Sequence, residues 1–227
     1  MIFKKKVLGI ITARGGSKGL PNKNILNLHG RPLIYWTIAA AKQSRYIDRL
    51  ILSTDSEAII SLAQKYGCDV PFKRDSNLAL DETASMTVVM DALERCSGYD
   101  CVVLLQPTSP LRTVEDIDGA IETMIEAKAP ACVTLCEASE SPSWMYKMNH
   151  QSQLKSISNA VPVSRRQELE RLFVINGAVY VANIEWLRKS LSFIADETVG
   201  YVMSREKSID IDCKLDFLLA EVLMGQE

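Results

Sequence analysis

The sequence predicts an α/β protein with a largely parallel sheet and helices on both of its faces. Short apolar runs rich in β-branched residues recur along the chain, and the segments between them repeat their apolar residues with a helical period of about 3.6. Strands and helices that alternate in this way form parallel sheets covered on both sides. With 227 residues, 47% of them hydrophobic, the chain suits a single domain, residues 1–227, with a sizeable core.

The predicted elements follow one another along most of the chain. The expected strands are the β-branched runs Val7–Thr12, Arg49–Ser53, Val102–Leu105, Ala131–Leu135 and Phe173–Val181. The expected helices are the periodic segments Pro32–Gln43, Glu57–Lys65, Ala84–Arg95, Val114–Ala127 and Lys214–Met224. Helix-start signals support these bounds, because Pro32 suits a first helical turn, Ser56 precedes the second helix as a cap, and Thr113 is followed by two acidic residues.

The region 139–171 interrupts this alternation. It is polar, contains two prolines, and keeps neither the strand period nor the helix period. A long disordered loop is one interpretation; the other is an excursion whose Trp144, Met145 and Tyr146 pack against a second subunit, since interface cores are enriched in such side chains. We favour the second interpretation and expect a homodimer with a dimerisation excursion at about residues 139–171.

Charge and composition narrow the function classes. The chain has 26 Lys and Arg against 28 Asp and Glu, so its net charge of -2 gives no general attraction to nucleic acid or to an anionic membrane, and neither is expected as a partner. The opening MIFKKK precedes too short an apolar run for a signal peptide, and no segment approaches the roughly 18 apolar residues of a membrane span, so we expect a cytoplasmic protein. Six scattered cysteines lack metal or disulfide spacing, which predicts reduced, mostly buried thiols.

The stretch IITARGGSKGLPNKN, Ile10–Asn24, carries the first functional signal. It leaves the carboxyl end of the first expected strand, where open α/β sheets bind ligands. Its glycines let backbone N–H groups turn toward an anion, and Arg14, Lys18 and Lys23 add positive charge, which together predict a polyphosphate site. A solvated basic loop is the alternative. The stretch matches neither a P-loop nor GxGxxG, which argues against an NAD-dependent oxidoreductase.

The same stretch resembles the nucleotide-binding signature ARxxSKGLPxKN of the acylneuraminate cytidylyltransferases, also called CMP-sialic acid synthetases. The likeness continues in order through STDSEAI at 53–59, LLQPTSPLR at 104–112, SRRQEL at 164–169, NGAVY at 176–180 and SIDID at 208–212. This resemblance implies a Rossmann-like nucleotidyltransferase fold. It also implies attack by the anomeric hydroxyl of a nine-carbon acidic sugar on the α-phosphate of CTP, with release of pyrophosphate. A different acidic sugar, such as pseudaminic acid, or a non-catalytic nucleotide-binding module are the alternatives.

The resemblance also assigns nucleotide contacts. By carry-over, the nucleotide-binding residues are Ala13, Arg14, Ser17, Lys18, Lys23, Asn24, Arg74, Ala84 and Ser85. Arg14 and Lys23 should grip the triphosphate, with Lys23 nearest the α-phosphate, so both are expected to be catalytic. Met86 stands where the family usually carries a hydroxyl, so that contact is lost or taken over by Ser85 or Thr87, and the base preference stays open.

For the acceptor sugar, the resemblance assigns Gln106, Arg166, Tyr180 and Phe193. Gln106 follows an expected strand at its carboxyl end, as an active-site residue should. The family often has two adjacent phenylalanines near position 192, whereas this chain reads Ser192-Phe193. Half of that aromatic wall is therefore missing, which leaves open whether the acceptor is N-acetylneuraminic acid or a 5,7-diacylamino relative such as legionaminic acid. Arg112 is a further cation in this region, and a structural role at a helix start suits it as well as a contact with the acceptor.

The pair Asp210 and Asp212 points to a metal. The two alternate on an extended segment, so both carboxylates should project from one side. Mg2+ binds through one or two carboxylates together with substrate phosphates, so we expect Mg2+ as the cofactor and Asp212 as a catalytic residue. The alternative is that Asp212 caps the closing helix. Asp216 and Glu221 are expected to lie on that helix's surface.

Overall fold

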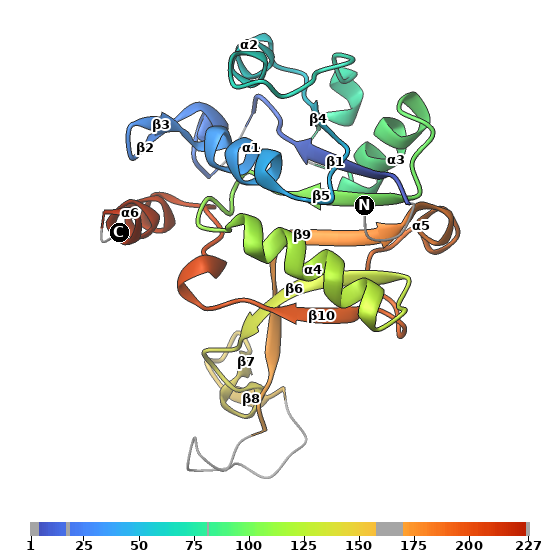
Figure 1. Cartoon of the computed structure of the whole chain (residues 1–227). Helices are drawn as coiled ribbons and strands as arrows, with labels where there is room; N and C mark the ends of the chain where they lie inside the picture. Colours follow the sequence, from blue (N-terminus) through green and yellow to red (C-terminus); the bar gives the residue numbers. More distant parts are fainter. Residues whose placement is uncertain (1–4, 17–18, 81, 158–169, 226–227) are drawn as a thin grey trace.

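The computed structural model describes residues 5–16, 19–80, 82–157 and 170–225. Its centre is a six-stranded sheet in the order β10-β6-β9-β5-β1-β4 (Figure 1). The strands are β1 (Val7–Thr12), β4 (Arg49–Ser53), β5 (Cys101–Leu105), β6 (Ala131–Glu137), β9 (Phe173–Asn183) and β10 (Val199–Val202). Only β9 runs against its neighbours in this sheet, since it pairs antiparallel with both β5 and β6 while the other pairings are parallel. The prediction of a largely parallel α/β sheet is confirmed.

Helices cover both faces of the sheet (Figure 1). They are α1 (Leu33–Gln43), α2 (Glu57–Lys65), α3 (Ser85–Arg95), α4 (Val114–Glu126), α5 (Ile184–Ser190) and α6 (Lys214–Met224). The five predicted helices are present with bounds within one residue of those expected, and Pro32 is the N-cap of α1 rather than its first residue. The sequence did not predict α5, the strand β10, or the hairpins β2 (Asn27–Leu28)–β3 (Arg31–Pro32) and β7 (Tyr146–Met148)–β8 (Leu154–Ser156).

Alternate residues of β1 enter two different cores. Val7 and Ile11 pack in the cluster that includes residues of α1 and α4, whereas Leu8 and Ile10 pack in the cluster that includes residues of α3 and α5. Side chains of a strand point to opposite faces in turn, so a strand covered on both sides reads as a continuous apolar run. Each fully buried aliphatic side chain contributes about 1.5–3 kcal/mol to stability, so these clusters fix the strand ends that carry the site.

A third apolar cluster anchors α6 beside those strand ends. It contains Leu28, Leu33, Ile211 and Ala220. The N-cap of α6 is Cys213, whose main-chain nitrogen donates to Asp216 Oδ2 at 2.8 Å in a capping box. The alternative that Asp212 caps this helix is therefore wrong, and so is the expectation that Asp216 is plain helix surface, because Asp216 completes the cap.

The region expected to be an excursion leaves the main sheet. In Figure 1 the β7–β8 hairpin lies beyond β10, at the far end of β9 from α5. Every residue of these two short strands is exposed, as are Phe173, Val174 and Ile175 at the start of β9. Arg166 and the rest of 158–169 lie outside the described residues. Packing of this region on a second subunit stays a prediction.

The cysteines are placed as the sequence predicted. All six cysteines are free, four of them buried, with Cys136 partly exposed and Cys213 exposed. Burial raises the pKa of the Cys68 and Cys132 thiols to about 12, so these groups stay protonated and inert. Within the described ranges, no helix has the length and apolar character needed to cross a membrane.

Candidate active site

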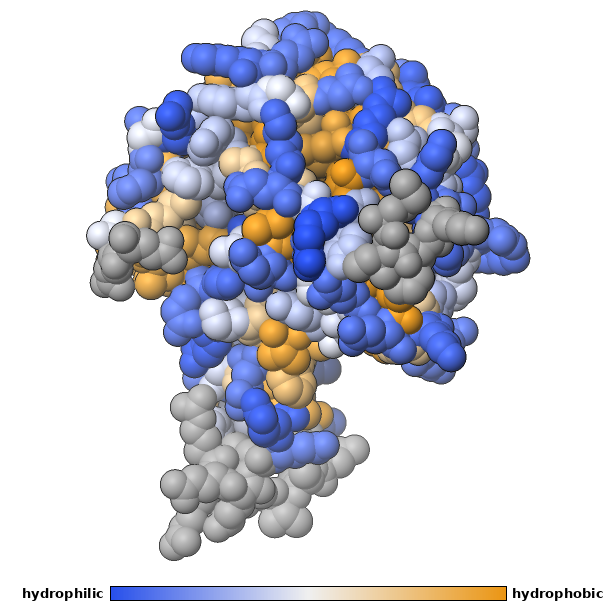
Figure 2. All heavy atoms as spheres, viewed as in Figure 1, coloured by the Kyte–Doolittle hydropathy of each residue, from blue (hydrophilic) through white to orange (hydrophobic). Residues whose placement is uncertain are grey.

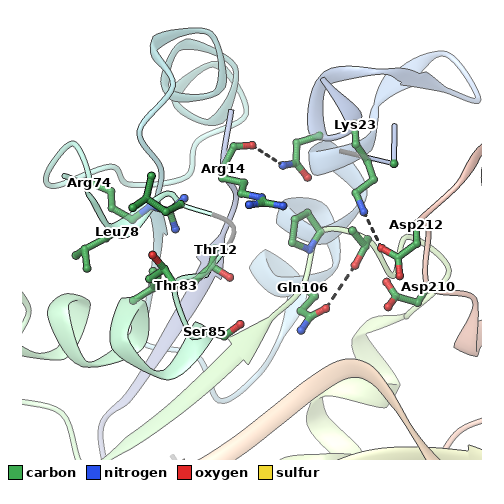
Figure 3. Close-up of a pocket in the computed structure, with 16 residues that line it drawn as sticks. Thr12, Arg14, Lys23, Arg74, Leu78, Thr83, Ser85, Gln106, Asp210 and Asp212 are labelled. Carbon is green, nitrogen blue, oxygen red and sulfur yellow. Dashed lines mark hydrogen bonds and ion pairs between the residues drawn. The ribbon is translucent and has the colours of Figure 1, made fainter. Parts of the chain in front are cut away.

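A cavity of about 440 Å³ opens at the carboxyl ends of β1 and β5 (Figure 3). It brings together most of the side chains that the sequence assigned to a nucleotide, a metal and an acceptor. The assigned residues that line it are Arg14, Lys23, Asn24, Arg74, Ser85, Gln106, Asp210 and Asp212. Open α/β sheets bind ligands at this end of their strands, so the position agrees with the chemistry expected from the residues.

The loop after β1 is held in shape from both of its ends. Gly15 N donates to Asp55 Oδ1 at 3.0 Å, and Asn24 Nδ2 donates to the main-chain oxygen of Arg14 at 3.0 Å. Asn24 is buried, so its amide holds the main chain of the loop from the interior of the protein. Ser17 and Lys18, two of the expected nucleotide contacts, lie outside the described residues.

Arg74 forms the opposite wall of the cavity from Lys23 (Figure 3). Its side chain is buried, with Nη2 3.4 Å from the main-chain oxygen of Ala13 and 3.6 Å from Asp55 Oδ1. Burial lowers the pKa of the Arg74 guanidinium, and the charge of Asp55 opposes that shift. Ala13 is itself only 1% exposed. Its main-chain nitrogen donates to Ser53 O, and its main-chain oxygen accepts from Arg74.

The start of α3 has no side-chain cap from its N-cap residue. Ala84 occupies that position, and Thr87 N donates to Ala84 O at 3.0 Å. Met86 packs against the core, while Ser85 and Thr83 line the cavity. Of the two residues expected to replace the missing hydroxyl contact, Ser85 therefore has the better position.

The two aspartates lie together on the far side of the cavity. Ile211 between them is fully buried, and its N–H donates to Thr108 O at 2.8 Å, so Asp210 and Asp212 line the same cavity, as the alternation predicted. Lys23 Nζ donates to Ile211 O at 2.6 Å and to Asp212 Oδ1 at 3.0 Å. The side chain of Lys23 is 13% exposed and that of Asp212 is 79% exposed.

The aspartate pair fits a hard divalent cation. Asp210 Oδ1 is buried and has no hydrogen-bond partner among the described residues. Burial raises the pKa of the Asp210 carboxyl, a hydrogen bond from Thr108 opposes the shift, and the nearby charge of Asp212 adds to it. The described residues contain no cluster of three or more acidic, His or Cys side chains, so a cation here needs further oxygen ligands from substrate or water, as Mg2+ commonly takes.

A second cavity of about 300 Å³ shares Gln106 and Asp210 with the first and extends to Tyr180. Gln106 Oε1 lies 3.5 Å from Thr108 Oγ1, so the single proton of that hydroxyl is shared between Gln106 and Asp210. Burial raises the pKa of the Tyr180 hydroxyl, with the charge of Asp210 adding to it, so the phenol stays protonated and able to donate. Phe193, expected to contact the acceptor, is 6% exposed, and its ring lies 5.4 Å from that of Tyr180, so it supports Tyr180 from the core.

Arg112 is the buried structural cation that the sequence allowed. Its Nη1 donates to the main-chain oxygens of Gln106 at 3.1 Å and Ala178 at 2.7 Å, which ties the loop after β5 to β9. Burial lowers the pKa of the Arg112 guanidinium to about 10, and the charge of Asp116 opposes that shift. The side chain stays protonated at neutral pH.

Comparison with known proteins assigns the family. A family model described as cytidylyltransferase matches residues 8–214, most of the chain. The chain belongs to the cytidylyltransferase family. As a cytidylyltransferase it is an enzyme, and the cation-lined loop and paired aspartates agree with nucleotidyl transfer.

The chain is also similar to curated proteins that are named as CMP-sugar-acid synthases and cytidylyltransferases. The chain is 36% identical to the CMP-N,N'-diacetyllegionaminic acid synthase of Legionella pneumophila, with 96% of each chain covered. It is 34% identical to the pseudaminic acid cytidylyltransferase of Campylobacter jejuni, also with 96% of each covered. It is 34% identical to the N-acylneuraminate cytidylyltransferase of Escherichia coli O18:K1:H7, covering 96% of this chain and 52% of that one.

A solved structure supports the fold. The CMP:2-keto-3-deoxy-manno-octonic acid synthetase, complexed with CTP, superimposes with a TM-score of 0.73 at 18% identity, covering 97% of this cytidylyltransferase and 99% of that chain. At that identity the match speaks for the Rossmann-like nucleotidyltransferase fold alone.

Several residues lining the cavities escaped the sequence assignment. They are Thr12, Gly19, Leu78, Leu80, Thr83, Val88, Pro107 and Thr108 in the first cavity and Cys136, Val174, Ile175, Asn176, Gly177 and Ser208 in the second. Thr108 and Asn176 lie within the stretches QPTSP and NGAVY that carry the family resemblance, so the signal for them was present. Nothing local marks Leu78 or Cys136, because chain segments distant in sequence bring them to the site.

Proposed function

We propose that this enzyme transfers CMP from CTP to the anomeric hydroxyl of a nonulosonic acid and releases pyrophosphate. The observation that carries the proposal is the pair of adjoining cavities that share Gln106 and Asp210. One cavity has cations and carboxylates suited to a triphosphate, and the other has polar groups suited to a sugar. The names of the relatives support an acceptor of the neuraminic, legionaminic or pseudaminic type.

On the nucleotide side, this chain's residues supply charge and position. Arg14 and Lys23 bring positive charge to the cavity from the loop after β1, and such groups stabilise charge that builds on phosphoryl oxygens in the transition state. Asp210 and Asp212 would hold Mg2+, which when bound neutralises charge on the triphosphate. Lys23 Nζ already contacts Asp212, so the cation of the loop and the proposed metal ligand are positioned together.

On the acceptor side, Gln106 and Tyr180 offer hydrogen bonds to the sugar. Arg166, which lies outside the described residues, is proposed to bind the sugar carboxylate from the partner subunit. Phe193 packs against Tyr180, and Ser192 stands where the family that the sequence resembles often has a second phenylalanine, so the aromatic wall of this pocket has one ring fewer. That difference favours the bulkier 5,7-diacylamino acids over N-acetylneuraminic acid.

We also propose that the enzyme is a homodimer. Two apolar groups on the described surface support it. The first is on the hairpin and the start of β9 and comprises Tyr146, Met148, Leu154, Phe173 and Val174; the second is on α6 and comprises Leu215, Leu218, Leu219 and Val222. Figure 2 shows apolar residues exposed on the lower projection, where Figure 1 places the β7–β8 hairpin and the start of β9, and near the C-terminal end. An isolated two-stranded hairpin is marginally stable in water, so a partner would stabilise this one.

Product identification tests the proposal. The purified enzyme is incubated with Mg2+, each of four nucleoside triphosphates, and N-acetylneuraminic, N,N'-diacetyllegionaminic or pseudaminic acid. Pyrophosphate release is followed, and products are identified by mass spectrometry. We expect a CMP-sugar from CTP, with one acid preferred. CTP binding without turnover on any acid would instead support a non-catalytic nucleotide-binding module, and turnover with another nucleotide would overturn the CTP assignment.

A further inference from the structure

An irregularity in the sheet lies directly behind both cavities. Val133 of β6 pairs with Tyr180 of β9, whereas Leu135 pairs with Ile175, so Thr134 alone stands opposite residues 176–179. The extra residues of β9 form a bulge, and bulges commonly redirect side chains next to active sites. This bulge begins where the pairing of β9 with β5 ends, at the strand end that leads into Gln106.

The amide of Asn176 holds the bulge together from inside. Its side chain is buried, and Oδ1 accepts from Thr134 Oγ1 at 2.6 Å and from Ala178 N at 3.1 Å. The Thr134 hydroxyl has one proton, so it donates to Asn176 and accepts from Val179 N at 2.9 Å. The side-chain amide of Asn176 thus joins Thr134 of β6 to the main chain of the bulge at Ala178.

The other end of the same amide reaches the aspartate segment. Asn176 Nδ2 donates to Ser208 Oγ at 2.9 Å, and Ser208 Oγ in turn donates to Ser204 O at 2.7 Å. Ser208 stands two residues before Asp210 on the short segment that leads into the cavity. The segment that carries Asp210 is therefore tied to the bulge by a part-buried hydrogen bond.

Gly177 sets the spacing on the exposed side of the bulge. Its φ is +75°, a conformation that favours glycine. A Cβ on Gly177 would lie 3.3 Å from Gln106 Oε1 and 3.8 Å from Asp210 Oδ2. The amide of Gln106 and the carboxylate of Asp210 thus pack against the bare backbone at Gly177, and a methyl group there would crowd Gln106 Oε1 and lie in ordinary contact with Asp210.

We propose that the Asn176–Gly177 bulge positions Asp210 and Gln106 relative to one another, with Asn176 acting on Asp210 through Ser208. Asn176 and Ser208 are positioning residues, since neither needs to touch the reacting atoms. The bulge thereby sets the distance between the metal side and the acceptor side of the site. This inference rests on the proposed function, because it concerns the same Mg2+ and acceptor groups.

The test removes the hydroxyl that ties the bulge to the segment of Asp210, together with that hydroxyl's own bond to Ser204 O. Ser208→Ala deletes the hydroxyl and leaves the hydrogen bonds of Asn176 Oδ1 in place, and Ser208→Thr restores a hydroxyl. Binding of CTP is measured by calorimetry without any acceptor, once with Mg2+ and once with a chelator. Groups that orient metal ligands typically change metal affinity by 10- to 100-fold when removed, so we expect Ser208→Ala to weaken CTP binding roughly tenfold with Mg2+ and to leave it unchanged with the chelator.

A matched control is Ser190→Ala on α5. Ser190 Oγ is part-buried and donates to Ser192 O at 2.8 Å, and no residue of α5 lines either cavity. We expect this variant to bind CTP like the wild type under both conditions, and Ser208→Thr to recover most of the Mg2+-dependent affinity. Unchanged Mg2+-dependent binding in Ser208→Ala overturns the inference, as does a loss of equal size with the chelator. Absence of any Mg2+ effect in the wild type overturns it too.

A second variant tests the acceptor side. Gly177→Ala should raise the KM for the acceptor at least as much as it weakens Mg2+-dependent CTP binding, because its Cβ meets Gln106 first. A fall in thermal stability with both constants unchanged would show a merely structural bulge and overturn the inference. If no acid is turned over by the wild type while Ser208→Ala still loses Mg2+-dependent CTP binding, the proposed acceptor chemistry fails and the positioning of Asp210 stands.

Discussion

Lys23 is the cation whose removal tests the phosphate site most directly. Its side chain is largely buried, and Nζ contacts a main-chain oxygen and an exposed carboxylate. An ion pair with so exposed a partner contributes about 0–1 kcal/mol to folding, and the hydrogen bond to Ile211 O contributes about 1 kcal/mol. Lys23→Ala should therefore cost about 1–2 kcal/mol of stability, which lowers Tm by roughly 2–8 °C for a chain of this size.

The catalytic cost should be much larger than the folding cost. Removal of one preorganised group that stabilises transition-state charge lowers kcat by roughly 100- to 1000-fold, or about 2.7–4 kcal/mol. We expect that loss in Lys23→Ala, measured as pyrophosphate release at saturating CTP and acceptor, with the folded state confirmed by its melting curve. If kcat stays within about twofold of the wild type, the loop does not act on the transferred phosphoryl group.

Lys189→Ala is the matched control for this experiment. Lys189 Nζ also binds a carboxylate, Glu185 Oε1 at 2.8 Å, but on the exposed surface of α5. It should keep wild-type kcat and nearly wild-type Tm. Loss of activity in both variants would mean that removing any such surface charge disturbs the enzyme, and the assignment of Lys23 would fall.

Three further experiments address the remaining assignments. Asp212→Asn should remove most Mg2+-dependent turnover, and Asp210→Asn should act mainly by raising the Mg2+ concentration needed; wild-type Mg2+ titrations in both would exclude the metal site. Tyr180→Phe should raise the acceptor KM about tenfold with the KM for CTP unchanged, since it removes one hydrogen bond worth about 1.4 kcal/mol; an equal change in both constants would place Tyr180 elsewhere. Co-refolding Arg166→Ala with Asp212→Asn chains should restore about a quarter of wild-type activity, because half of the random dimers have one intact site; confirmed heterodimers without activity would place Arg166 in its own subunit's pocket.

The sequence predicted most of the sheet because strand and helix periods are local. The four-residue β10 was missed because it alternates partly buried Val199 and Tyr201 with exposed residues and contains a glycine. Tertiary packing favours that glycine, since a Cβ on Gly200 would displace the side chain of Leu135 of β6. The seven residues of α5 are too few to show a helical period. Nor does any period reveal that β9 runs antiparallel to its neighbours, because strand direction depends on the connections.

The sequence predicted those parts of the site whose functional groups lie close together along the chain. The cation-rich loop and the SIDID pair could be identified because each stretch carries several functional groups together. Phe193 was assigned to the acceptor because sequence alone does not show that its ring is buried against Tyr180. The role of Asn176 depends on Thr134 and Ser208, which lie 42 and 32 positions away, so only the folded chain reveals it.

The two sides of the site are supported by different parts of the fold, and this has a consequence for specificity. The nucleotide side depends on the loop after β1, whose main chain is held by Asp55 and Asn24. The acceptor side depends on the bulge of β9 and on the loop after β5, which Arg112 joins through two main-chain oxygens. These supports share no side chain among those hydrogen bonds. Substitutions that reshape the acceptor pocket around Tyr180 can therefore change which acid is used without a matching change in CTP affinity, provided that they leave the bulge intact.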